Sequence, residues 1–160
     1  MAVDFILDLE GVPGECKKEG FEGKIDISSW AGGGSRGGAF AIGGGGASGA
    51  ASISDIMVTK VFDKASPQME MCLLSGKHIP SGTITCRKST GDKQEMYLEI
   101  KIFDIIVTSY SKSGGGGDDI HESYSFNFAR IEQKYKEQAA DGSLTDAGEY
   151  KFDVQKGNTY

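Results

Sequence analysis

The fold is decided by residues 95–110, which read EMYLEIKIFDIIVTSY. Apolar side chains recur there at every second position, which is the period of a β-strand with one buried face. The apolar residues fall into two sets of opposite parity: Met96, Leu98, Ile100 and Ile102, then Phe103, Ile105 and Val107. The parity changes near Phe103, so we predict a bulge or a sharp bend there, as at the corner of a β-barrel.

The same two-residue period recurs on both sides of this long strand. It appears in residues 3–9, 25–27, 83–87, 124–128 and 150–155, and the parity changes again after Phe128. Residues 52–62 are apolar at both parities, so we expect a strand that is buried on both faces or that lies at an interface. These stretches predict a mainly β protein, and bent strands favour a barrel over a flat sandwich.

One segment, residues 66–76, has the pattern of a helix. Ser66 is a good N-cap residue and Pro67 suits the first helical position. Met69, Cys72 and Leu73 lie on one face, and Gly76 fits a left-handed C-terminal position. We therefore expect one domain over residues 1–160, with two antiparallel sheets that close into a barrel and one short flanking helix.

Glycine is unusually frequent, with 24 of 160 residues. Ten of these glycines fall between residues 32 and 49, inside a loop that we place at 31–51. Such a composition fits a flexible surface linker, and it also fits a protruding hairpin that becomes ordered on a partner. The sequence alone leaves both interpretations open.

Charge and composition exclude several classes of protein. The net charge of −6 argues against nucleic acid or an anionic membrane as a partner. No apolar run approaches the ~20 residues of a membrane span, so we expect no membrane insertion.

The three cysteines are odd in number and contain no C-x-x-C pair, so free thiols are expected in a protein made in the reducing cytosol. The start, MAVDFILDLEGVPGE, lacks the features of a signal peptide.

No motif in the chain supports catalysis or a cofactor. The G-x-G-x-x-G matches at Gly32 and Gly44 and the G-x-S-x-G match around Ser35 are not followed by the helix that each site requires. His78 and His121 stand alone, so no metal site is expected. Asp118, Asp119 and Glu122 lack the spacing of a calcium loop and are interpreted as a solvated turn.

A longer stretch carries a family resemblance. Residues 59–80, TKVFDKASPQMEMCLLSGKHIP, show the pattern T-K-x-x-D-K-x-S-P followed by a helix and S-G-K-H. Together with the opening segment, KIDISSW at 24–30 and FNFARIEQKYKEQAADGS at 126–143, the chain resembles the haemolysin-coregulated protein (Hcp) family over about residues 1–155.

The resemblance implies a structural, non-enzymatic component of the type VI secretion system of Gram-negative bacteria. It implies a homohexameric ring that stacks into a tube inside a contractile sheath and beneath a spike. The ring would hold small effector proteins in its lumen. It would be cytoplasmic before firing and then secreted without a signal peptide.

The resemblance also implies roles for particular residues. In the family, the glycine-rich hairpin extends toward the next ring, so we expect Gly43, Gly44, Gly45 and Gly46 in the ring-stacking contact. Family members often carry a lumen-facing serine directly after the tryptophan. This chain has Ala31 at that place, so either its cargo differs or the position shifts to Ser29 or Ser35. We expect Ser29 and Ala31 to face the lumen. We expect the subunit interface at Trp30, Val58 and Phe62.

Two readings of other classes remain. One is a monomeric β-barrel that binds a small ligand in an internal polar pocket, and a monomeric mass would favour it. The other is a hydrolase built on Ser35, which needs a histidine and an aspartate within hydrogen-bond reach.

Overall fold

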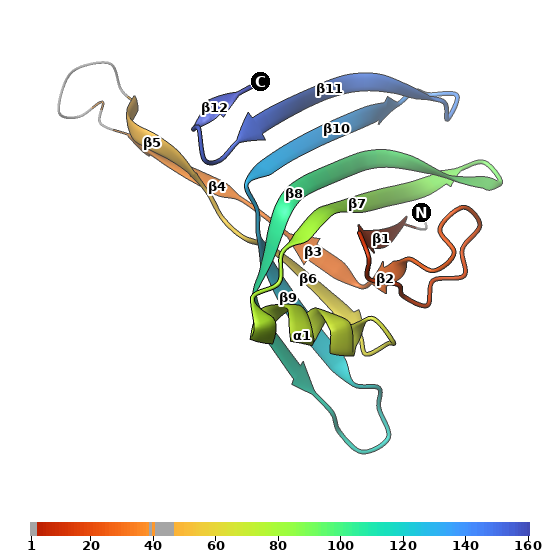
Figure 1. Ribbon diagram of the computed structural model, residues 1–160. Coiled ribbons are helices and arrows are strands. Elements are labelled where there is room, and N and C mark those ends of the chain that lie inside the picture. Colours follow the sequence, from red (N-terminus) through yellow and green to blue (C-terminus); the bar gives the residue numbers. More distant parts are fainter. Residues whose placement is uncertain (1–2, 39, 41–46) are drawn as a thin grey trace.

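The computed structural model describes residues 3–38, 40 and 47–160 (Figure 1). Their secondary structure is mainly β with one helix, α1 (Ser66–Ser75), as the sequence predicted. The strands are β1 (Val3–Leu9), β2 (Ile25–Ile27), β3 (Ser29–Ala31), β4 (Gly34–Gly38), β5 (Ala47–Ile53), β6 (Ile56–Val61), β7 (Ile79–Thr90), β8 (Lys93–Ser113), β9 (His121–Asn127), β10 (Arg130–Gln138), β11 (Leu144–Asp153) and β12 (Asn158–Thr159).

The strands form two antiparallel sheets that share β8. The large sheet has the order β12-β11-β10-β8-β7-β1-β2, and the small sheet has the order β3-β6-β9-β8. Strands β4 and β5 pair only with each other and reach away from the body of the molecule (Figure 1).

The predicted bend in the long strand is confirmed. Residues Leu98–Phe103 of β8 pair with β10 in the large sheet, while β8 from Ile106 to Ser113 pairs with β9 in the small sheet. Asp104 lies between these two halves with φ of 55°, a left-handed conformation. The second parity change, after Phe128, separates β9 from β10, where the chain returns from the small sheet to the large one.

The two sheets enclose one core, but their hydrogen-bonded ladder does not close on itself. Strands β2 and β3 are joined through Ser28, where the chain bends from one sheet into the other, and the Ser28 N–H donates to the Thr59 carbonyl at 2.7 Å. Strand β3 pairs with β6 and not with β10 or β11. The expected barrel is therefore open along a seam between β3 and the β10–β11 end of the large sheet.

The expected single strand over residues 52–62 is wrong, because the chain breaks at Ser54 and Asp55. The Asp55 carboxylate accepts hydrogen bonds from Thr108 Oγ1 at 2.6 Å and Asn127 Nδ2 at 2.9 Å. Side-chain bonding of this kind competes with a ladder. The first half, β5, belongs to the hairpin, and the second half, β6, belongs to the small sheet.

Helix α1 packs on the core through Met69 and Cys72, as its spacing predicted, and Gly76 ends it with φ of 71°. Its start differs from the prediction. Ala65 is the N-cap and has no side-chain cap, whereas Ser66 is the first helical residue. The Ser66 hydroxyl is used instead in a buried polar network, described below. The expected free thiols are confirmed at Cys16, Cys72 and Cys86, all of them buried.

The described part of the glycine-rich loop is paired as a hairpin, and its ordering on a partner stays a prediction. Gly34 pairs with Ile53 and Gly38 with Ala47. The expected stacking residues Gly43, Gly44, Gly45 and Gly46 lie outside the described residues. Among the residues that the structure describes, no helix is long and apolar enough to cross a membrane.

Candidate functional site

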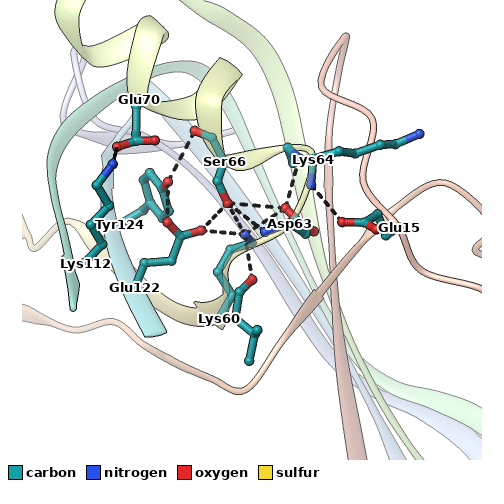
Figure 2. A network of polar contacts seen from close by, with 11 residues as sticks. Glu15, Lys60, Asp63, Lys64, Ser66, Glu70, Lys112, Glu122 and Tyr124 are labelled. Carbon is teal, nitrogen blue, oxygen red and sulfur yellow. Dashed lines mark hydrogen bonds and ion pairs between the residues drawn. The ribbon is translucent and has the colours of Figure 1, made fainter. Parts of the chain in front are cut away.

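A buried ion pair joins the small sheet to the start of α1 (Figure 2). Lys60 on β6 donates from Nζ to Glu122 Oε1 on β9 at 2.7 Å, and neither side chain has any exposed area. Lys60 Nζ also lies 2.8 Å from Ser66 Oγ and 2.9 Å from Asp63 Oδ1. The lysine, aspartate and serine of the T-K-x-x-D-K-x-S-P pattern therefore meet at one point.

Further hydrogen bonds complete this network. The Ser66 hydroxyl donates to Glu122 Oε1, and the Tyr124 hydroxyl donates to Glu122 Oε2 at 2.9 Å. Burial raises the pKa of Tyr124 far above its ordinary value, and the Glu122 carboxylate beside it adds to the rise. Within the described residues, every buried side-chain N and O atom has a hydrogen-bond partner. The network therefore satisfies its buried hydrogen-bonding groups, with one lysine between two carboxylates, and it links the start of α1 to the small sheet.

Glu122 corrects an expectation from the sequence. The sequence predicts a solvated turn of Asp118, Asp119 and Glu122, and the first two residues are exposed, but Glu122 is buried, with 4 % of the whole residue exposed. The sequence of β6 already indicates that Glu122 has a buried partner, because Lys60 has the same parity as the buried residues Ile56 and Val58. A lysine on the buried parity requires a buried acid, and β9 pairs Glu122 with it.

The outward side of the small sheet, which we call the hydroxyl face, carries the two expected lumen residues. Ser29 and Ala31 are both exposed there. The face follows from the strand alternation and the registers, and it consists of Ser29, Ala31, Met57, Thr59, Val61, Ile106, Ser109, Ser111, Ser113, His121, Ser123, Ser125 and Asn127. Two pairs of hydroxyls bond to each other across the strands, Ser29 with Thr59 at 2.6 Å and Ser111 with Ser123 at 2.8 Å.

The expected interface residues fall in three different environments. Trp30 is half-buried, packs against the core and lines a cavity of about 340 Å³ in the seam of the barrel, together with Ile131 on β10 and Tyr150 on β11. Phe62 is 36 % exposed and lies beside Lys112, whose Nζ is 5.8 Å from the ring centroid. Val58 has no exposed area, so its side chain offers no surface to a neighbour.

Cys86 lies next to Trp30, and burial raises the pKa of its thiol to about 11. A hydrogen bond from the Trp30 indole acts in the opposite direction. The thiol therefore stays protonated near neutral pH and is a poor nucleophile.

The residues weighed for catalysis are not brought together. Ser35 lies in β4 opposite Ser52, in a strand pair rather than in a strand-to-helix turn. His78 and His121 are both exposed. In the described part of the chain, no group of three or more His, Cys, Asp or Glu side chains is placed to hold a metal ion.

Comparison with known proteins assigns the family. A family profile described as "Type VI secretion system effector, Hcp" matches residues 6–135. The protein Hcp1 of Pseudomonas aeruginosa is 38 % identical over 153 residues, which cover 95 % of this chain and 94 % of that protein. The chain belongs to the Hcp family. It is therefore a type VI secretion system protein, and the resemblance drawn from residues 59–80 is confirmed.

Solved structures show the same fold. A type six secretion system protein superimposes with a TM-score of 0.91 at 24 % identity, over 99 % of this chain and all of that one. Hcp1 from Salmonella typhimurium superimposes with a TM-score of 0.78 at 24 % identity, over the whole of both chains. A type VI secretion system effector from Yersinia pestis gives 0.72 at 26 % identity, over 94 % of this chain and all of that one. The open barrel with its hairpin is thus the Hcp fold.

Proposed function

We propose that this Hcp chain is a structural subunit of the secreted tube, assembled as a ring of six that stacks on further rings. The observation that carries the proposal is the β4–β5 hairpin. It extends from the barrel, pairs only with itself, and is exposed at every residue of β4 (Figure 1).

Such a hairpin has little to stabilise it within one subunit. Its described residues are mostly Gly, Ala and Ser, and an isolated two-stranded ribbon is marginal in water. Glycine also loses more backbone entropy on ordering than any other residue. A second surface that pairs with or covers the hairpin would supply the missing stabilisation. We assign that surface to the next ring, with Gly43, Gly44, Gly45 and Gly46 in the contact.

The ring itself would form through the open seam. A closed ring uses a head-to-tail interface, in which two different patches of the subunit meet. The seam exposes Tyr150 (44 %) and half-exposes Trp30, and the large sheet ends at an edge strand, β12. Covering exposed edges removes a standing aggregation hazard. We place Trp30 in one patch and Phe62 in the other.

In such a ring the hydroxyl face would line the lumen, with Ser29 and Ala31 toward the cargo. The cargo would be small effector proteins, carried from the cytoplasm and exported with the tube. The sheath would contact the outside of the stacked rings, and the spike would cap them.

Native mass tests the proposal most directly. Light scattering after size exclusion should give six times 17.0 kDa, or 102 kDa. A 17.0 kDa monomer over a wide concentration range would contradict the ring. That result would favour the second candidate, a monomeric barrel that binds a small ligand in the seam cavity beside Trp30 and Tyr150.

A further inference from the structure

The hydroxyl face differs from the rest of the chain in its charge. A quarter of all residues are Asp, Glu, Lys or Arg, yet none of these occupies an outward position in β3, β6, β9 or the second half of β8, strands that the structure describes completely. The charged residues of these strands, Lys60, Lys112 and Glu122, take the inward parity and bond to each other or to α1. Two carboxylates lie at its margins: Asp118 Oδ2 is 3.8 Å from His121 Nε2, and Asp55 is bonded to Thr108 and Asn127.

Three of the four apolar residues of this face are grouped on one half of it, and the fourth, Ile106, lies on β8 opposite Asn127. Ala31, Met57 and Val61 lie on the neighbouring strands β3 and β6, and Met57 and Val61 are 47 % and 40 % exposed. The other half, on β9 and β8, presents serines and His121. Several hydroxyls are already paired with one another, so they offer a partner only part of their bonding capacity.

We propose that the hydroxyl face binds small proteins through uncharged, partly apolar surfaces, with Met57 as the main contact. The inference rests on the proposed tube, which puts this face in the lumen. Over the middle of this face, away from Asp118, a charged side chain of the cargo would lose water and find no counter-charge, which disfavours charged surfaces. Methionine is flexible and polarizable, so it adapts to different apolar partners.

Binding of this kind has two consequences. The affinity changes little with ionic strength, because dissolved salt screens only interactions between charges. It is also weak at each subunit, since one half-exposed methionine buries a small area. Six copies around a ring would raise the overall affinity by multivalency, while each contact still breaks easily for release.

The test uses a labelled synthetic peptide of about 20 residues, rich in Ser, Gly and Asn with four Leu, and fluorescence anisotropy. Two matched peptides carry four Lys or four Asp in place of four Ser. The neutral peptide should bind tightest, and its Kd should change less than about twofold between about 20 and about 500 mM NaCl. Met57→Ser should weaken binding by at least about fivefold.

Met71→Ser is the matched control, since Met71 is 58 % exposed but lies on α1. It should leave the Kd within about twofold of the unsubstituted chain. Equal losses from both substitutions, tighter binding of a charged peptide, or loss of the native mass in Met57→Ser alone would each overturn the inference. Light scattering on the unsubstituted chain tests the ring separately, so a failed ring and a failed binding face give different results.

Discussion

At the scale of single residues, Lys60 and Glu122 connect the start of helix α1 to the small sheet. Their ion pair is fully buried and bridges β6, β9 and the first turn of the helix (Figure 2). Helix α1 has no side-chain cap at Ala65, and the hydroxyl of its first residue, Ser66, donates to Glu122. A buried pair of this kind stabilises the fold only while both partners are present.

Removal of one partner is therefore expected to destabilise the chain strongly. Lys60→Met should lower the free energy of unfolding by about 3–5 kcal/mol, because it leaves the Glu122 carboxylate buried without its cation. Thermal unfolding should show a loss in Tm of roughly 10 °C at matched protein concentration. Lys101→Met is the control, since the Lys101 side chain is 46 % exposed and its Nζ lies 3.5 Å from Glu99 Oε1. It should lower the free energy of unfolding by less than about 1 kcal/mol.

The double variant Lys60→Met, Glu122→Met separates charge from packing. It should recover part of the loss, because it removes the Glu122 carboxylate, while the largely buried Asp63 still lacks its cation. A double variant no more stable than Lys60→Met would show that the network acts through shape and not through charge.

At the scale of elements, the corner in β8 sets the architecture. One strand of 21 residues serves two sheets because its backbone turns at Asp104, where φ is 55°. Aspartate tolerates this left-handed region better than most residues, and a β-branched side chain does not.

Substitution at Asp104 should therefore follow backbone preference, since the side chain is exposed. Asp104→Gly should leave Tm unchanged or slightly higher. Asp104→Val should lower the free energy of unfolding by about 1–2 kcal/mol. Chemical denaturation of both variants measures the difference. Equal stability of the two would contradict the strained corner.

At the scale of the whole molecule, the projecting hairpin separates ring formation from ring stacking. Phe40, near its tip, is 85 % exposed, an unusual position for a phenylalanine in a free subunit. In the proposed tube it would be covered by the next ring.

Phe40→Ser should leave the 102 kDa particle intact and reduce tube formation several-fold, as counted by electron microscopy. Leu74→Ser is the control, because Leu74 is 67 % exposed on α1, away from the hairpin. Tubes of normal length from Phe40→Ser would contradict a stacking role for this residue.

Much of this architecture was predictable from local patterns. Period-two runs predicted the strands, the parity changes at Phe103 and Phe128 predicted the two crossings between sheets, and Gly76 predicted the helix end. These features depend on a few neighbouring residues, so they can be read from the chain. The family also followed from sequence, through residues 59–80.

The polar sites followed from tertiary contacts. Glu122 lies 62 residues from Lys60, and only the β6–β9 register brings them together in a buried pair. The residues of the hydroxyl face likewise come from four strands, and only the pairing registers between these strands bring them to one face.

Sequence by itself thus determined most strands of the two sheets, the bends and the family of this protein, because each depends on short-range periodicity or on a contiguous motif, whereas β4, β5 and β12 carry no such pattern. Only the tertiary structure decided which side of each strand is outward, why Lys60 is buried, and that Val58 is enclosed while Met57 is exposed. The physical reason is that burial depends on which distant strands pair and in which register, and a one-residue shift would reverse both faces.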